Sequence, residues 1–162
     1  YVPHTGHSLH GTDAVYSMAS YFNAILNETK LPDYDWNILA DGSIKVTTLN
    51  RPKEVLLWQC TNTEARDFRI EVTGKTWVSR QLRSDGKGSY LAKVSEPPKG
   101  WTAFMVELTF PEIEKRSNTK KLGERLGKSN NQIGVPLKFT TGVHVVPKTM
   151  PYEFKQVPIP ER

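Results

Sequence analysis

The chain has 162 residues, of which 37% are hydrophobic and 24% are charged, and its formal net charge is +5. These values are typical of a folded globular protein and exclude a disordered chain. No stretch is long and apolar enough to cross a bilayer, so the sequence predicts no membrane span.

Much of the positive charge lies in one polar stretch, residues 112–134, which holds six Lys or Arg against three Glu. A basic surface attracts anionic partners such as nucleic acids. However, no aromatic side chain that would stack on bases is interleaved with these charges. We interpret the stretch as a long polar connection, and we expect no nucleic-acid partner.

The first twelve residues predict a turn that leads into a helix. They read Tyr-Val-Pro-His-Thr-Gly-His-Ser-Leu-His-Gly-Thr, with His7 between Gly6 and Ser8. Apolar residues then recur at the three- and four-residue spacing of one helical stripe: Val15, Met18, Ala19, Phe22, Ile25 and Leu26. A hydroxyl of Thr12 or Ser8 would cap this helix. Pro32 requires the helix to end near residues 27–30.

Three histidines, His4, His7 and His10, are evenly spaced and raise the question of a metal site. They would share one helical face, but Pro3 and Gly6 oppose a helix there. Zinc sites also usually include a carboxylate or a cysteine with fixed geometry. We therefore expect no metal ion and no cofactor.

Cys60 is the only cysteine, so a disulfide within the chain and a cysteine-based zinc site are both excluded. Its neighbours Leu56, Leu57 and Trp58 are apolar and predict a strand. A free cysteine in such a strand usually behaves as a small buried hydrophobe. We do not expect Cys60 to be a nucleophile.

After residue 33 the hydrophobic period changes from helical to that of strands. Turn residues separate short extended segments at 36–39, 43–48, 54–61, 68–72, 77–82, 90–94, 101–110 and 138–146. Ala40-Asp41-Gly42 joins the first two as a hairpin, because glycine adopts positive φ at little cost. Seven or eight such strands predict a mainly β fold, an antiparallel β-sandwich of the immunoglobulin or fibronectin kind. Each of the four tryptophans falls in a strand region, where we expect it to pack in the core.

The sequence thus divides into three parts. Residues 1–31 contain the histidine turn and the helix, residues 32–150 form the β-sandwich with the polar insertion at 112–134, and residues 151–162 form an extended tail. The change of period near residues 30–33 marks the boundary between the first two parts.

Several segments together resemble one protein family. They are Tyr-Val-Pro and Gly-His-Ser-Leu near the start, Leu-Pro-Asp-Tyr-Asp-Trp at 31–36, Leu-Trp-Gln at 57–59, Ala-Arg-Asp-Phe-Arg at 65–69, the segment from Gly-Trp-Thr-Ala-Phe to Phe-Pro at 100–111, and Phe-Thr-Thr-Gly-Val at 139–143. This combination is similar to the PhoPQ-activated pathogenicity-related proteins, a family that includes the autocrine proliferation repressors. The resemblance runs over most of the chain except residues 112–134.

The resemblance implies an α/β-hydrolase-like domain followed by a β-sandwich, as in relatives of prolyl-oligopeptidase-type peptidases. Residues 1–31 would then be the last turn and helix of the hydrolase-like domain, and His7 would be the catalytic histidine. The order in such enzymes is nucleophile, acid, histidine. The serine and the acid would lie upstream, because the chain contains no Gly-x-Ser-x-Gly motif. The upstream domain of the same protein is therefore an expected partner.

Two functions follow from this reading as expectations. In the first, the chain is the C-terminal part of a secreted or periplasmic serine hydrolase that acts on peptides or esters. In the second, the protein is a non-catalytic secreted signalling or virulence-related protein, and its β-sandwich binds a protein partner. One fold supports many functions, so the fold alone does not decide between them.

Overall fold

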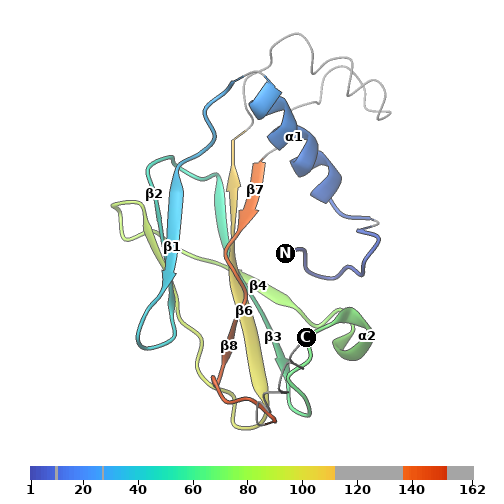
Figure 1. Ribbon diagram of the computed structural model, residues 1–162. Coiled ribbons are helices and arrows are strands. Elements are labelled where there is room, and N and C mark those ends of the chain that lie inside the picture. Colours follow the sequence, from blue (N-terminus) through green and yellow to red (C-terminus); the bar gives the residue numbers. More distant parts are fainter. Residues whose placement is uncertain (10, 27, 112–136, 153–162) are drawn as a thin grey trace, which may run out of the picture.

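The computed structural model describes residues 1–9, 11–26, 28–111 and 137–152. Its elements in chain order are α1 (Ala14–Leu26), β1 (Tyr34–Ile38), β2 (Ile44–Thr48), β3 (Glu54–Asn62), α2 (Ile70–Thr73), β4 (Val78–Gln81), β5 (Ser89–Ala92), β6 (Trp101–Phe110), β7 (Leu137–Thr140) and β8 (His144–Val146) (Figure 1). The predicted polar insertion at 112–134 and residues 153–162 of the predicted tail lie outside the described residues. No helix in the described ranges has the length and apolar character needed to cross a membrane.

The described strands form two antiparallel sheets, which confirms the prediction of a mainly β chain. One sheet has the order β1-β2-β5, and the other has the order β4-β3-β6-β7, with β8 also paired to β6. The predicted hairpin joins β1 to β2, and Gly42 in its turn has φ of 81°. Residues 82–88 cross from β4 in the larger sheet to β5 in the smaller one.

A single hydrophobic core joins the two sheets. Ile44, Val46 and Ala92 of the smaller sheet belong to the same buried cluster as Leu57 and Phe104 of the larger sheet. In Figure 1, β1 and β2 lie on one side and β3, β6, β7 and β8 on the other. On β3, Val55 and Leu57 are both buried in this cluster.

The tryptophans are half-buried rather than central to the core. Trp36 packs against the core cluster, and Gly142 lies so close to it that an added Cβ would be 2.9 Å from the Trp36 ring. Cys60 is buried with 1% of its surface exposed, as predicted, and its Sγ lies 3.2 Å from Oγ1 of Thr76.

Strand β6 is covered on both faces. Phe104, Val106 and Leu108 face the core, and the alternate residues Met105 and Glu107 are buried as well. The N-terminal segment lies beside Met105 and α1 lies beside Glu107, so both lie over this second face. A central strand with both faces covered reads as a nearly continuous apolar run, and Trp101–Phe110 has that character.

The prediction of a strand at 68–72 is wrong, because Ile70–Thr73 form the short helix α2. The Asp67 carboxylate accepts a hydrogen bond from the Arg69 N–H at 3.1 Å, and the Thr73 hydroxyl donates to the Arg69 carbonyl oxygen. These local bonds favour a helical turn over a sheet ladder. Gly74, with φ of 64°, then ends the helix.

The last strand, predicted as continuous over 138–146, is divided into β7 and β8. Both pair with β6, and residues 141–143 interrupt the ladder between them. Thr141 occupies the interruption: its Oγ1 accepts a hydrogen bond from the Val106 N–H at 3.0 Å, and its own N–H donates to the Val106 carbonyl oxygen. The side chain thereby replaces a ladder bond.

Candidate functional site

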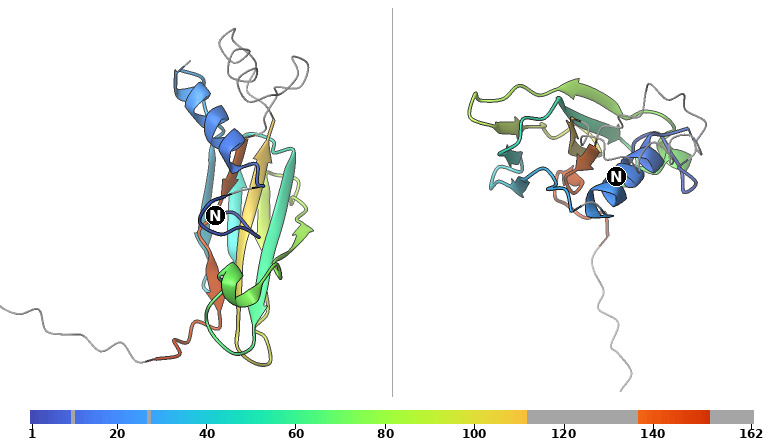
Figure 2. Two further views of the ribbon diagram at one scale, coloured as in Figure 1. Left: turned by 90° about the vertical axis from the view of Figure 1, so that its right-hand side faces the viewer. Right: turned by 90° about the horizontal axis from the view of Figure 1, so that it is seen from above.

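The N-terminal segment lies across the face of the larger sheet that points away from the core (Figure 2). The His4 ring meets the Trp58 ring of β3 edge to face, with centroids 5.6 Å apart. A Cβ added at Gly6 would lie 3.8 Å from Cγ2 of Ile70, so α2 lies close beside the segment. These contacts hold the segment against the sheet up to the turn that carries His7.

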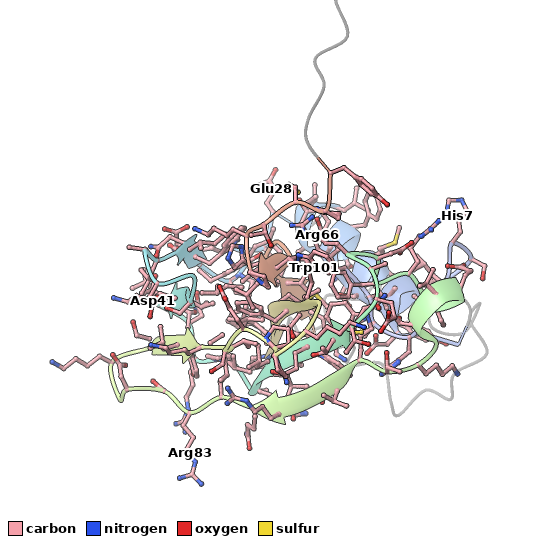
Figure 3. The ribbon with its side chains drawn as sticks, turned by 90° about the horizontal axis from the view of Figure 1, so that it is seen from below. His7, Glu28, Asp41, Arg66, Arg83 and Trp101 are labelled. Carbon is pink, nitrogen blue, oxygen red and sulfur yellow. The ribbon has the colours of Figure 1, made fainter. Side chains whose placement is uncertain are left out.

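His7 lies on a turn formed by residues 6–9. The Leu9 N–H donates to the Gly6 carbonyl oxygen across this turn, and Leu9 itself has φ of 54°. The His7 side chain is exposed, and Figure 3 shows it at the periphery of the molecule, pointing away from both sheets. The site residue predicted from sequence is therefore accessible and contributes nothing to the core.

The turn leads directly into α1, as predicted. Oγ1 of Thr12 accepts a hydrogen bond from the Ala14 N–H at 3.3 Å, which satisfies one first-turn donor. The helix ends at Leu26, close to the predicted end at 27–30. The backbone of Glu28 then has φ of 51° and leaves the helical path.

One face of α1 is attached to β7 by polar contacts. The Ser17 hydroxyl donates to the Lys138 carbonyl oxygen at 3.2 Å and accepts from the Lys138 N–H at 3.1 Å. Nζ of Lys138 lies 2.7 Å from Oδ2 of Asp13 and 3.5 Å from Oε1 of the buried Glu107. Burial lowers the pKa of Lys138, but the hydrogen bond to Asp13 and the charge of Glu107 outweigh it and leave this pKa raised.

Within the described part of the chain, nothing covers the opposite face of α1. Its apolar side chains are at least half exposed: Val15 (52%), Met18 (53%), Phe22 (57%), Ile25 (50%) and Leu26 (81%). We call these five side chains the α1 apolar face. Only Ala24 of this helix is buried. The stripe that the sequence predicted is present, but the two sheets do not cover it.

A groove of about 320 Å³ lies between α1 and β7. Met18, Tyr21 and Phe22 line it from the helix, Leu137 and Phe139 line it from the strand, and Leu9 lines it from the turn. Two members of the α1 apolar face, Met18 and Phe22, thus border the groove as well. His7 does not line it.

Sequence reasoning identified the turn and the helix but missed the residues that attach the helix to the sheet. Ser17 and Lys138 are separated by 121 positions, and no local pattern connects them. The three histidines do not form a metal site in the part that is described: His4 packs on Trp58, His7 is exposed, and His10 lies outside the described residues. No group of three His, Cys, Asp or Glu side chains in that part is placed to hold a metal ion.

Comparison with known proteins gives two matches. Residues 1–69 match the family described as PhoPQ-activated pathogenicity-related protein. The chain is also 26% identical over 171 aligned residues to Autocrine proliferation repressor protein A of Dictyostelium discoideum, an alignment that covers 93% of this chain and 32% of that protein. The first 69 residues are thus similar to the PhoPQ-related family, and most of the chain is similar to this relative. The chain spans about a third of the length of that relative. No solved structure matches the chain.

Proposed function

We propose that this chain is the C-terminal part of a secreted or periplasmic serine hydrolase that acts on peptides or esters. The observation that carries the proposal is the exposed His7 on a turn directly before α1, inside the segment matched by the PhoPQ-related family. In α/β-hydrolases the catalytic histidine follows the nucleophile and the acid in the chain. The two sheets would form an accessory sandwich of the immunoglobulin or fibronectin kind beside the hydrolase-like part.

In this proposal His7 acts as the general base and then as the general acid. Its imidazole takes the proton from the nucleophilic serine as the serine attacks the carbonyl carbon, and it returns that proton to the leaving group. The serine and the carboxylate that orients His7 come from the preceding part of a longer protein. We expect these 162 residues alone to have no hydrolase activity.

The direct test is the His7→Ala variant of the longer protein, compared with Ser8→Ala on the same turn. Both side chains are exposed, so neither substitution removes packing against the sheets. We expect His7→Ala to lower kcat at least 10³-fold with little change in the unfolding transition, and Ser8→Ala to retain most activity. Unchanged turnover in His7→Ala would exclude His7 as the catalytic base.

A second function is favoured by the name of the relative, which describes an autocrine proliferation repressor. In this alternative the longer protein is a non-catalytic secreted signalling or virulence-related protein, and its β part binds another protein. Loss of the serine or of the acid from the preceding part, together with absence of hydrolysis, would favour the alternative.

A further inference from the structure

We infer that a cleft between the loop after β2 and the loop before β5 binds a small phosphate monoester. The cleft has a volume of about 510 Å³, which is typical of small-molecule sites. The first loop lines it with residues 48–52, and the second lines it with residues 84 and 86–88, next to Tyr90 of β5. None of these residues belongs to the turn that carries His7, so the inference adds a binding site and does not rest on the proposed function.

The two loops are held together by their backbones. The Thr48 N–H donates to the Gly88 carbonyl oxygen at 3.0 Å. Gly88 has φ of 80°, and a Cβ added to it would lie 2.6 Å from the Thr48 carbonyl oxygen, so this approach requires glycine. Within the second loop, Oγ of Ser84 accepts a hydrogen bond from the Gly86 N–H at 3.1 Å. The walls of the cleft are therefore positioned before any ligand arrives.

The residues that line the cleft include two cations and no carboxylate. Arg51 belongs to the first loop and Lys87 to the second, and both are exposed. Neither forms an ion pair with a carboxylate in the described part of the chain. Asp85, the acidic residue of the second loop, does not line the cleft: its Oδ1 accepts the N–H groups of Lys87 and Ser89, at 2.8 and 3.0 Å. The cleft therefore favours an anion.

The sequence argues against the basic stretch 112–134 as the occupant of this cleft. Its six Lys or Arg against three Glu give it a net positive charge. Like charges repel, so such a stretch is a poor partner for Arg51 and Lys87. A separate anionic molecule suits the cleft better.

The neutral donors of the cleft favour phosphate over carboxylate. Oδ1 of Asn50 accepts the Asp33 N–H at 2.7 Å, so the amide NH₂ is the part of Asn50 that can donate to a ligand. The Ser84 hydroxyl can donate as well. A phosphate monoester carries about 1.5 to 2 negative charges and three acceptor oxygens, whereas a carboxylate carries a single charge and two oxygens. Two cations and two neutral donors therefore match the phosphate.

The cleft is larger than a phosphate group alone. Leu49, Pro52 and Tyr90 supply apolar and aromatic surface beside the charged groups, and Leu49 is 86% exposed. The organic part of an ester would cover such surface, because removing apolar area from water is favourable. This part of the lining extends the inference from inorganic phosphate to a phosphate ester.

NMR titration of the isotope-labelled 162-residue chain with phenyl phosphate tests the inference. Arg51→Gln and Lys87→Gln each remove one cation of the cleft, and Arg83→Gln is the matched control. Arg83 is also exposed and lies between β4 and β5, but it does not line the cleft, and Figure 3 shows its side chain pointing away from the sheets. At about 0.15 M salt, charges more than about 8 Å apart are largely screened. The amide spectrum also shows whether each variant is folded.

We expect saturable shifts of the amides at 50–52 and 86–88, with the Kd raised about 10-fold or more in Arg51→Gln and in Lys87→Gln. Arg83→Gln should leave the Kd unchanged, and inorganic phosphate and benzoate should bind more weakly than phenyl phosphate. Absence of saturable binding would overturn the inference, and so would an equal loss in Arg83→Gln, which would indicate general charge attraction. Benzoate binding as tightly as phenyl phosphate would contradict the phosphate, and inorganic phosphate doing so would contradict the ester.

Discussion

The Ser17 hydroxyl completes the hydrogen bonding of Lys138 on the free edge of β7. It bonds both the N–H and the carbonyl oxygen of that residue, at 3.1 and 3.2 Å. A neighbouring strand would normally satisfy these two groups, and here a single side chain of α1 does so. Because α1 follows the His7 turn directly, this contact relates the position of the turn to the sheet.

We predict that Ser17→Ala weakens the attachment of α1. The substitution leaves the N–H and the carbonyl of Lys138 without their partner, and a net loss of about 1–2 kcal/mol in the free energy of unfolding is expected. Urea denaturation measures that loss, and hydrogen exchange at the α1 amides should accelerate. Ser95→Ala, at an exposed serine after β5, is the control and should change neither quantity. An unaltered midpoint and unaltered exchange in Ser17→Ala would show that the contact does not hold the helix.

The division between β7 and β8 depends on Thr141, which is 1% exposed. Thr141→Val keeps the shape of the side chain but removes the acceptor of the buried Val106 N–H. An unpaired buried N–H costs about 1–3 kcal/mol, so we expect destabilisation of that size. Thermal or urea unfolding checks it, with Thr47→Val at an exposed position of β2 as the control. Equal stabilities of the two variants would contradict this role of Thr141.

The hairpin between β1 and β2 contains a carboxyl group with a strongly lowered pKa. Hydrogen bonds from the Ser43 hydroxyl and the Ser43 N–H, followed by the contact with Lys93, lower the pKa of Asp41 from 3.8 to about 2. A lowered pKa in the folded state stabilises the fold above the unfolded value of 3.8, and this contribution is lost as the pH falls from there to about 2.

NMR titration of the Asp41 carboxyl carbon tests the assignment. We expect Ser43→Ala to raise the pKa of Asp41 toward its ordinary value, because it removes the largest cause of the shift. Lys93→Ala should raise it less. An Asp41 titration near 3.8 in the unsubstituted protein would contradict the arrangement of this turn.

The sequence predicted α1 and the hairpin between β1 and β2, because residues close together in the chain determine both. The three- and four-residue spacing before Leu26 specified α1, and Asp41-Gly42 specified the hairpin turn. The hydrophobic period alone did not predict α2, because local side-chain hydrogen bonds competed with it. Ile70 and Val72 alternate with charged residues as in a strand, but the bonds between Asp67, Arg69 and Thr73 produced a helix.

In the candidate site, the sequence predicted the local features and missed a contact between residues far apart in the chain. His7 and its turn were predictable because the residues that define them are adjacent in the chain. The attachment of α1 to β7 was not, because it depends on Ser17 and Lys138, which only the folded chain brings together. Likewise, the sequence of β6 does not indicate which segments cover its second face, because that cover comes from the N-terminal residues and α1.

The proposed hydrolase is tested most directly by labelling the longer protein with a fluorophosphonate, which reacts with activated serine nucleophiles. The 162-residue chain and the His7→Ala variant of the longer protein are labelled beside it. We expect labelling of the longer protein, strongly reduced labelling of its His7→Ala variant, and no labelling of the 162-residue chain. Absence of labelling in the folded longer protein would contradict a serine hydrolase, and equal labelling of the His7→Ala variant would contradict the role of His7.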